Sequence, residues 1–547
     1  MKIPTPDDPR RRRIALAGLL IITALLGLRG IGNESSVMLG GDMARYVMNG
    51  VFVHDLIADG GVTNYETLTR YAERYYAKYP ALSLGHHPPV PYLSVVPFFW
   101  LFGISVLAIR LAALGWFLAG AWGVYAVTNR LFNWQAAMWA AVLFITNLIV
   151  LRSGQYLLSE MPMAALVLWS VHALLRFCDS RRVSHFLWFI ALVVASLYAK
   201  QLAVLLFPVY VAIVIWKFGW RHLLTRRALG AAAIVVVLSI PIAIMTVGLS
   251  PRSFGMALTN AMRLFSGRQT AAVNRIVGTI ISAHLSIPAL AVTIASVVLL
   301  IVRRRPEVLI GLIWIVTVVL GSVVFAGTTE PARYAFGAIP AYSILIAALI
   351  TEAHSRKTKI LAVVLLSATL WWQVWTIRDV HPSGAGGYEE TAEFVLSRNR
   401  EPAVLYDSQI DTGYFMFFMR KHDPARSGII LRSDKIFWAG AWDREITPEA
   451  MHDLLKRLGI RWIVLEDRAE GPNRRPLFRA ELKGPRFVER KRVPVITTAV
   501  PGLSLVVYEY LDAVPADLDT EIRINLPIGE RDFVIRFRDL VGRNRQQ

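Results

Sequence analysis

The sequence of 547 residues contains little cysteine and few acidic side chains. Its single cysteine, Cys178, excludes an internal disulfide framework. Aspartate and glutamate number 39 against 59 lysine and arginine residues, which gives a formal net charge of +20 at pH 7. Such an excess is also found in nucleic-acid-binding proteins, so its position along the chain decides what it means.

The basic excess lies in the first 382 residues, which are also the apolar part of the chain. Residues 1–382 hold 33 basic and 14 acidic side chains, whereas residues 383–547 hold 26 and 25. Hydrophobic residues make up 55% of the chain and its mean hydropathy is +0.46, values that exclude an ordinary soluble protein. The charge therefore indicates the basic loops of a membrane protein, and we expect no nucleic-acid partner.

Apolar runs long enough to span a bilayer, or nearly so, recur up to residue 378. Because Arg10–Arg13 precede the first run, we place the N-terminus in the cytoplasm, and alternation then puts every strongly basic short loop there. The sequence predicts a polytopic α-helical protein of the inner or plasma membrane with about eleven spans and an extracytoplasmic C-terminus. The runs lie near residues 14–32, 105–127, 135–152, 158–177, 185–200, 201–217, 228–248, 279–302, 307–326, 334–351 and 359–378.

Two segments outside these runs are long. The loop at residues 33–103 ends in the aromatic stretch FFWLFG, which predicts a helix lying in the membrane interface. Residues 383–547 alternate helix patterns such as YEETAEFVLSRN with strand patterns such as AVLYD, GIILR and LSLVVYEYL, but contain no glycine-rich phosphate loop, metal-ligand spacing or nucleophile elbow. We therefore divide the chain into a transmembrane module, residues 1–382, and an extracytoplasmic α/β domain, residues 383–547.

Acidic residues at the outer ends of predicted spans are candidates for chemistry, because charge there is costly unless it is paired or functional. Asp42 in LGGDMARYVMNG precedes Arg45 by three residues, so the two share one face if the segment is helical. Glu160 begins another span from the same side and could meet Asp42. A solvated loop aspartate and a glutamate that complements a helix dipole are the structural alternatives.

Two cations face the same side of the membrane in this topology. Lys200 lies between two apolar runs, and Arg333, next to Tyr334, opens the tenth span. Each alone could snorkel to the interface. Together with the acidic pair, they indicate a phosphate-bearing lipid beside a general base.

A divalent metal ion is a possible cofactor, because the adjacent histidines His86 and His87 could supply a ligand. Asp42, Glu160 and His86 are the ligands to consider, since histidine and carboxylates are common metal ligands. Neighbouring side chains in an extended segment point in opposite directions, which disfavours both histidines as ligands of one ion. Hydrogen bonding to substrate is the alternative role.

These residues and their order resemble the GT-C superfamily of membrane glycosyltransferases, in particular glycosyltransferase family 39. The stretch GGDMARYV, with Asp42, Arg45 and Tyr46, is similar to the family's acidic motif after the first span. GHHPPVPYL lies where the family has a KPP or EKP segment, and FGISVLAIRLAALG resembles the start of its second span. The segments LLSEMPMAALVLW, LYAKQLAVLLFP and ARYAFGAIPAY resemble later motifs and carry Glu160, Lys200, Arg333 and Tyr334.

The resemblance implies an inverting transferase that moves a sugar from a polyprenyl-phosphate donor to a hydroxyl of a lipid, glycan or protein at the outer face of the membrane. It implies Asp42 as the general base and Glu160 as a second catalytic carboxylate, with Lys200 and Arg333 holding the lipid phosphate. The other residues implied to bind substrate are Arg45, Tyr46, His86, His87 and Tyr334.

Three positions depart from the family pattern. Asp42 lacks the following acid, Glu160 stands in place of aspartate, and the histidine pair replaces an acidic or basic residue before Pro88. Because the last change lies where substrate would bind, neither the sugar nor the acceptor is carried over from the family. A lipid-linked glycan ligase or oligosaccharyltransferase, a transporter or flippase, and a non-catalytic scaffold stay open as alternatives.

Overall fold

The chain forms two compact units, which are described separately. The helical unit comprises residues 1–29, 85–91 and 110–381, and the mixed unit comprises residues 30–84, 92–109 and 382–547. Most of the first predicted loop thus clusters with the C-terminal residues, and the division between residues 381 and 382 lies next to the predicted boundary. The computed structural model describes residues 9–31, 41–61, 64–84, 87–248, 255, 259, 262, 274, 277–326, 331–378, 386–398, 403–408, 413–436, 446–468, 476–496, 502–526 and 531–541.

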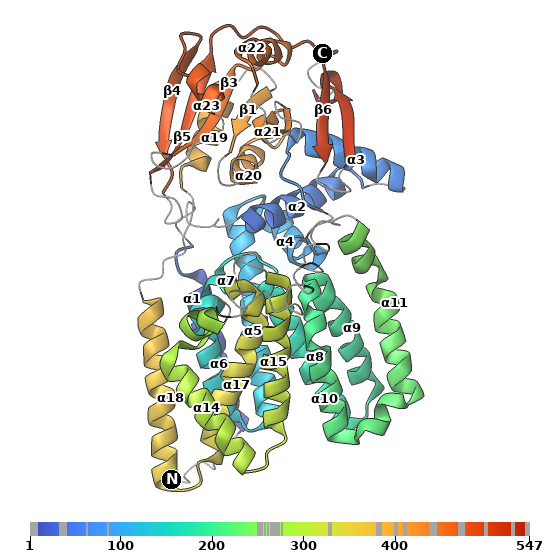
Figure 1. Ribbon diagram of the computed structural model, residues 1–547, viewed down its shortest axis with the longest axis vertical. Coiled ribbons are helices and arrows are strands. Elements are labelled where there is room, and N and C mark those ends of the chain that lie inside the picture. The colour runs from blue at the N-terminus through green and yellow to red at the C-terminus, as the bar shows by residue number, and fades with distance from the viewer. Residues whose placement is uncertain are drawn as a thin grey trace. The chain divides into compact units, whose positions relative to one another are not determined.

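The helical unit consists of apolar helices packed against one another (Figure 1). Aliphatic, small and aromatic side chains form its core. Phe117, Phe144 and Phe336 are completely buried in this core. Every apolar run predicted from the sequence contains helix. The helices are α1 (Pro9–Leu28), α5 (Val106–Leu131), α6 (Trp134–Ile145), α7 (Leu148–Gln155), α8 (Glu160–Ser180), α9 (Val183–Ala199), α10 (Phe207–Phe218), α11 (Arg226–Gly248), α14 (Ser286–Val302), α15 (Glu307–Ala326), α16 (Pro331–Tyr334), α17 (Ile339–Glu352) and α18 (Arg356–Ile377).

Several of these helices have the length and composition of membrane spans. Among the described residues, six are long and apolar enough to cross a membrane, and the bent pair α6–α7 is a seventh candidate. Four other apolar helices are shorter, namely α4 (Pro89–Phe102), α9, α14 and the apolar part of α15. These features are those of a multi-pass membrane protein, whereas the total of about eleven spans stays a prediction.

The run near residues 135–152, which was predicted as a single span, is instead two helices bent by 70°. Asn147 explains the break, because its side-chain oxygen accepts a hydrogen bond from the backbone N–H of Ile149 at 3.1 Å and so caps α7. Its Nδ2 donates to the carbonyl of His284 at 2.6 Å. The capping amide thus starts a new helix in the middle of an apolar run.

Arg110 ties the ends of two helices together inside the helical unit. Its buried guanidinium donates to the carbonyls of Gln155 at 3.0 Å, Gly27 at 3.0 Å and Arg29 at 2.7 Å. Gln155 ends α7 and Gly27 belongs to the last turn of α1, where carbonyls lack partners within the helix. The arginine of the FG…RL segment therefore has a structural role.

The mixed unit combines α2 (Gly41–Ala58), α3 (Tyr65–Lys78) and most of α4 (Pro89–Phe102) with a C-terminal α/β domain. A five-stranded sheet has the order β2-β1-β3-β5-β4, in which β1 is parallel to β2 and β3 while β5 is antiparallel to both neighbours. Strands β6 and β7 form a separate antiparallel pair. The elements are α19 (Tyr388–Arg398), β1 (Ala403–Asp407), α20 (Gly413–His422), β2 (Ile429–Arg432), α21 (Ser433–Ile436), α22 (Pro448–Arg457), β3 (Trp462–Arg468), α23 (Pro476–Glu481), β4 (Phe487–Pro494), β5 (Leu503–Tyr510), β6 (Glu521–Leu526) and β7 (Arg531–Arg536).

A buried ion pair joins α2 to α20 within the mixed unit. Arg420 donates to both carboxylate oxygens of Asp55, at 2.9 Å from Nε and 2.7 Å from Nη2, and the hydroxyl of Tyr75 donates at 2.8 Å. Burial alone would raise the pKa of Asp55, but the hydrogen bonds and charge of Arg420 outweigh it and hold this pKa below its usual value. The first predicted loop and the C-terminal domain are therefore firmly connected.

Candidate functional site

Glu160 is the first residue of α8, and its side chain is completely buried. Its Oε1 accepts hydrogen bonds from Nζ of Lys200 at 2.7 Å and from Nε of Arg333 at 3.0 Å. The N-terminus of α8 adds partial positive charge to the same place. The structure thus brings together three of the predicted site residues.

Lys200 owes its position to a break between two helices. It ends α9 and precedes the short 3₁₀ helix η2 (Gln201–Leu206), and its own backbone is extended, with φ −162° and ψ 129°. Its ammonium also lies 5.3 Å from the ring centre of Tyr334, within cation–π range. Tyr334, which lies at the start of the tenth predicted span, is therefore close to Lys200 in space although the two are distant in sequence.

The three charged side chains differ in exposure, which is 1% for Glu160, 13% for Lys200 and 28% for Arg333. A buried carboxylate without partners is costly by several kcal/mol, so the cations are what keep Glu160 in place. A lysine ammonium has three N–H donors, and Glu160 takes one of those of Lys200. The cluster is suited to bind a further anion.

Asp42, Arg45 and Tyr46 lie in the mixed unit, in the first turns of α2. Tyr46 is buried, whereas Asp42 and Arg45 are half-buried. The segment is helical, so the three-residue spacing places Asp42 and Arg45 on one face, which confirms the condition set from the sequence. The helix N-terminus favours a negative charge at Asp42.

The histidine and metal predictions receive less support. His86 lies outside the described residues, so its role stays a prediction, and His87 is buried ahead of α4. Glu160 does not suit a metal ion, because the two cations bonded to it would repel one. In the described part of the chain, the group of three side chains with metal-ligand spacing consists of Glu389, Glu393 and His422.

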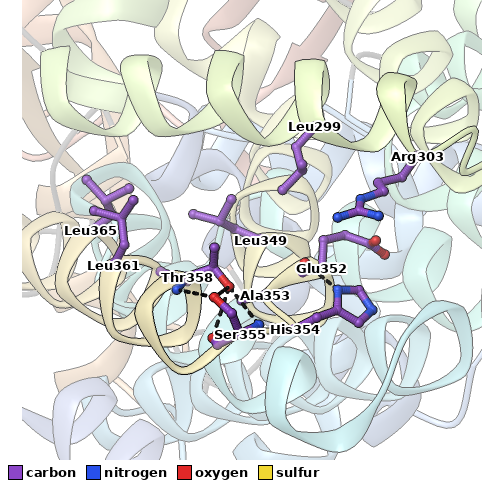
Figure 2. Close-up of a pocket in the computed structure, with 11 residues that line it drawn as sticks. Leu299, Arg303, Leu349, Glu352, Ala353, His354, Ser355, Thr358, Leu361 and Leu365 are labelled. Carbon is purple, nitrogen blue, oxygen red and sulfur yellow. Dashed lines mark hydrogen bonds between the residues drawn. The ribbon is translucent and has the colours of Figure 1, made fainter.

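A cavity of about 300 Å³ lies elsewhere in the helical unit, at the ends of α14, α17 and α18 (Figure 2). Leucines line one side, and Arg303 and Glu352 lie at its polar end. Glu352 is bonded to Arg305 at 2.7 Å. None of the predicted site residues lines this cavity, so it does not coincide with the candidate chemistry.

Two side chains that interact with Arg45 could not be identified from the sequence. Tyr76 of α3 and Lys435 of α21 both interact electrostatically with Arg45. Neither belongs to a motif. The packing of α21 against β6 and of α3 against β2 places them there, and no local pattern in the sequence signals such packing.

Part of the chain matches a known family. Residues 86–245 match the family model described as dolichyl-phosphate-mannose-protein mannosyltransferase. This range includes Glu160 and Lys200 but not Asp42 or Arg333. No curated protein sequence matches the chain.

Solved structures match nearly the whole chain. ArnT from Cupriavidus metallidurans bound to undecaprenyl phosphate has a TM-score of 0.55 at 14% identity, covering 91% of this chain and 98% of that one. Arabinofuranosyltransferase AftD from Mycobacteria gives 0.53 at 16% identity, covering 93% and 40%. Oligosaccharyltransferase AglB from Archaeoglobus fulgidus, with an inhibitory peptide and a dolichol-phosphate, gives 0.50 at 13% identity, covering 82% and 69%. The fold is therefore that of GT-C membrane glycosyltransferases.

Proposed function

We propose that this chain is an inverting glycosyltransferase that moves a sugar from a polyprenyl-phosphate donor to a hydroxyl of a lipid, glycan or protein at the outer face of the membrane. The observation that carries the proposal is the cation cluster of Lys200 and Arg333 around Glu160. Transfer from a phosphate ester needs cations where the leaving phosphate gains charge. The family-model match and the fold shared with ArnT support the same chemistry.

In the proposed reaction, Asp42 accepts the proton of the acceptor hydroxyl while its oxygen bonds to C1 of the sugar. The bond between C1 and the phosphate oxygen breaks with its electron pair, and polyprenyl phosphate leaves. A single displacement of this kind inverts C1. Glu160, which the sequence suggested as a second catalytic carboxylate, is better assigned as a positioning residue, because it holds both cations.

The lipid that co-purifies with the protein tests the donor class. Mass spectrometry of this lipid should show polyprenyl phosphate, with or without a single sugar. A glycan on polyprenyl pyrophosphate would replace the proposal with a ligase or oligosaccharyltransferase. Bulk phospholipid as the only bound lipid, after reconstitution with polyprenyl phosphate, would contradict a polyprenyl-phosphate donor.

Replacing the proposed base tests the mechanism. Asp42→Asn keeps the shape of the side chain but removes its basicity, so transfer should fall at least about a hundredfold, the usual scale for loss of a general base. The measurement is sugar transfer from a labelled polyprenyl-phosphate donor in proteoliposomes that contain envelope extract as the acceptor. Asp453→Asn is the matched control, since Asp453 pairs with Arg457 on the surface and is 61% exposed. A folded Asp42→Asn protein with full activity would remove Asp42 from the mechanism.

A further inference from the structure

The mixed unit contains a second group of cations, which includes Arg45 of α2 and Lys435 of α21. Both side chains are half-buried, and in the part of the chain that the structure describes neither forms a hydrogen bond or an ion pair. Burial lowers the pKa of Lys435, and the nearby charges of Arg432 and Arg45 lower it further. Two half-buried cations are thus near enough to repel each other.

The acids near Lys435 are already engaged with other arginines. Asp434 accepts from Arg432 at 2.8 Å and 2.6 Å, through both carboxylate oxygens. Asp532, the other acid that acts on Lys435, accepts from Nε of Arg523 at 3.0 Å. These pairings engage both acids that act on Lys435, while Asp42 is the acid that shares one face of α2 with Arg45.

Buried hydrogen-bond donors without partners lie beside these cations. Tyr76 is 1% exposed, its hydroxyl has no partner, and it interacts electrostatically with Arg432 and Arg45. Burial raises the pKa of Tyr76 to about 12, so the hydroxyl keeps its proton and can donate. Asn49, one turn after Arg45 on α2, is fully buried, and its Nδ2 is also without a partner. Unpartnered buried polar groups are rare and call for a ligand or water.

The surrounding elements hold these side chains on a rigid scaffold. Helix α21 packs against β1, β2 and β6, and α3 packs against β2 and β7 (Figure 1). Arg432 also donates to the carbonyl of Pro80 at 2.9 Å, which fixes the end of α3 to the end of β2. Asn49 of α2 accepts a hydrogen bond from the backbone N–H of Ser83, which follows α3, at 3.0 Å. These contacts fix α2, α3 and α21 to one another before any ligand arrives.

We propose that Arg45, Lys435 and Tyr76 form a binding site for the anionic group, a phosphate or a carboxylate, of the acceptor substrate. This inference rests on the proposed function, which assigns the donor phosphate to Lys200 and Arg333 and so requires a separate use for a second cation group. Asp42 lies one turn before Arg45 on the same face of α2, so an acceptor held by Arg45 reaches the proposed base. The acceptor is accordingly an anionic lipid or glycan.

Protection of Lys435 from acylation tests the site without any transfer assay. The probe is glycerol 3-phosphate, with glycerol as the uncharged control, added to the full chain in zwitterionic nanodiscs. At about ten times its Kd the probe leaves about a tenth of the sites empty, so acylation of Lys435 should slow about tenfold. Mass spectrometry compares Lys435 with Lys483 and Lys456, which should react equally with and without the probe. Equal rates at Lys435 with both compounds would overturn the proposal.

A second arm distinguishes the acceptor from the donor. Undecaprenyl phosphate in the nanodisc should leave Lys435 reactive, because its phosphate is assigned to the helical unit. Protection by undecaprenyl phosphate but not by glycerol 3-phosphate would assign the site to the donor and overturn our inference. Because this measurement reports binding alone, failure of the anion site and failure of the proposed function can be told apart. If Lys435 is still protected in Asp42→Asn but the wild type transfers no sugar, the proposed function is contradicted and the anion site is retained.

Two variants separate binding from folding. Arg45→Gln should abolish the protection of Lys435 by glycerol 3-phosphate, whereas Arg490→Gln, a surface variant on β4, should leave it unchanged. Tyr76→Phe removes only the unpartnered hydroxyl and should weaken protection several-fold, the loss expected for one hydrogen bond to an anion. Unchanged protection in both Arg45→Gln and Tyr76→Phe would contradict the site as described.

Discussion

Each unit contains a buried carboxylate bonded to cations, and the two clusters differ in how far the cations are buried. In the mixed unit, the side chains of Asp55 and Arg420 are 2% and 8% exposed. In the helical unit, Glu160 is 1% exposed, but its partners Lys200 and Arg333 are 13% and 28% exposed. The acid is hidden in both places, whereas only the helical unit leaves its cations accessible.

This difference separates a structural ion pair from one that can bind a ligand. Arg420 makes a bidentate contact with Asp55, and Tyr75 and His54 each add a hydrogen bond, so the carboxylate in the mixed unit has its full set of partners. Glu160 receives one hydrogen bond from each of two cations, and both of these cations are partly exposed. We therefore expect the Asp55 pair to hold elements together and the Glu160 cluster to respond to an added anion.

The largest effect should come from breaking the Asp55 pair. Asp55→Asn leaves Arg420 buried and unpaired, which typically costs about 3–5 kcal/mol. Hydrogen exchange of the full-length protein should then show amides of α2 and α20 exchanging at least about a hundredfold faster. Asp453→Asn on the surface should leave this exchange unchanged. Equal exchange in Asp55→Asn and the wild type would mean that the pair does not connect the two elements.

Lowering the pH should also break the Asp55–Arg420 pair in the wild type, because protonation removes the charge of Asp55. Because the pKa of Asp55 is lower in the folded protein, the stabilisation is fully present above its ordinary value of about 3.9 and is lost as the pH falls through the folded value. The protection factors of amides in α20, that is, exchange rates corrected for the intrinsic pH dependence of amide exchange, should accordingly stay constant from neutral pH down to about 4 and fall only below that. Asp55→Asn should lack this acid-dependent component.

Glu160→Gln should have a smaller effect on stability and a different response to ligand. The variant loses charge-assisted hydrogen bonds worth about 1.5–3 kcal/mol, but its cations can reach polar surroundings. Undecaprenyl phosphate should restore part of the lost thermal stability, because its phosphate supplies the missing negative charge. Glu352→Gln is a matched control, since Glu352 is a buried glutamate bonded to Nε of Arg305 at 2.7 Å and lies apart from the site. Equal recovery in both variants would show that the lipid does not act at the cluster.

Sequence reasoning located most helices and the charged residues, because hydropathy and charge are local properties. It placed Lys200 between two helices and Arg333 at the start of another, as the structure has them. It did not find that Glu160 lies between these cations, since its partners are 40 and 173 residues away in sequence. Which charges meet is decided by helix packing, and packing leaves no local pattern.

The same limit explains the missed elements of the mixed unit. The strands β1, β2 and β5 are apolar and were predicted, whereas β4, with the sequence FVERKRVP, is a charged edge strand. Helix α20 is buried on nearly all sides, so its residues GYFMFFMRKH lack the polar face that marks a helix in sequence. The break at Asn147 was missed because an apolar run hides a single capping amide.

The smallest effect should come from the second ion pair between the same regions, Asp59 with Arg426. Nη1 of Arg426 donates to Oδ2 of Asp59 at 2.6 Å, and this hydrogen bond outweighs burial and lowers the pKa of Asp59. The two side chains are 33% and 28% exposed, however, so water and salt screen the pair. Asp59→Asn should therefore cost less than about 1 kcal/mol, measured as exchange in α20, and the loss should vanish in 1 M salt while that of Asp55→Asn persists. A loss in Asp59→Asn that matches Asp55→Asn at high salt would show that exposure does not separate the two pairs, and that both hold the C-terminal domain to α2.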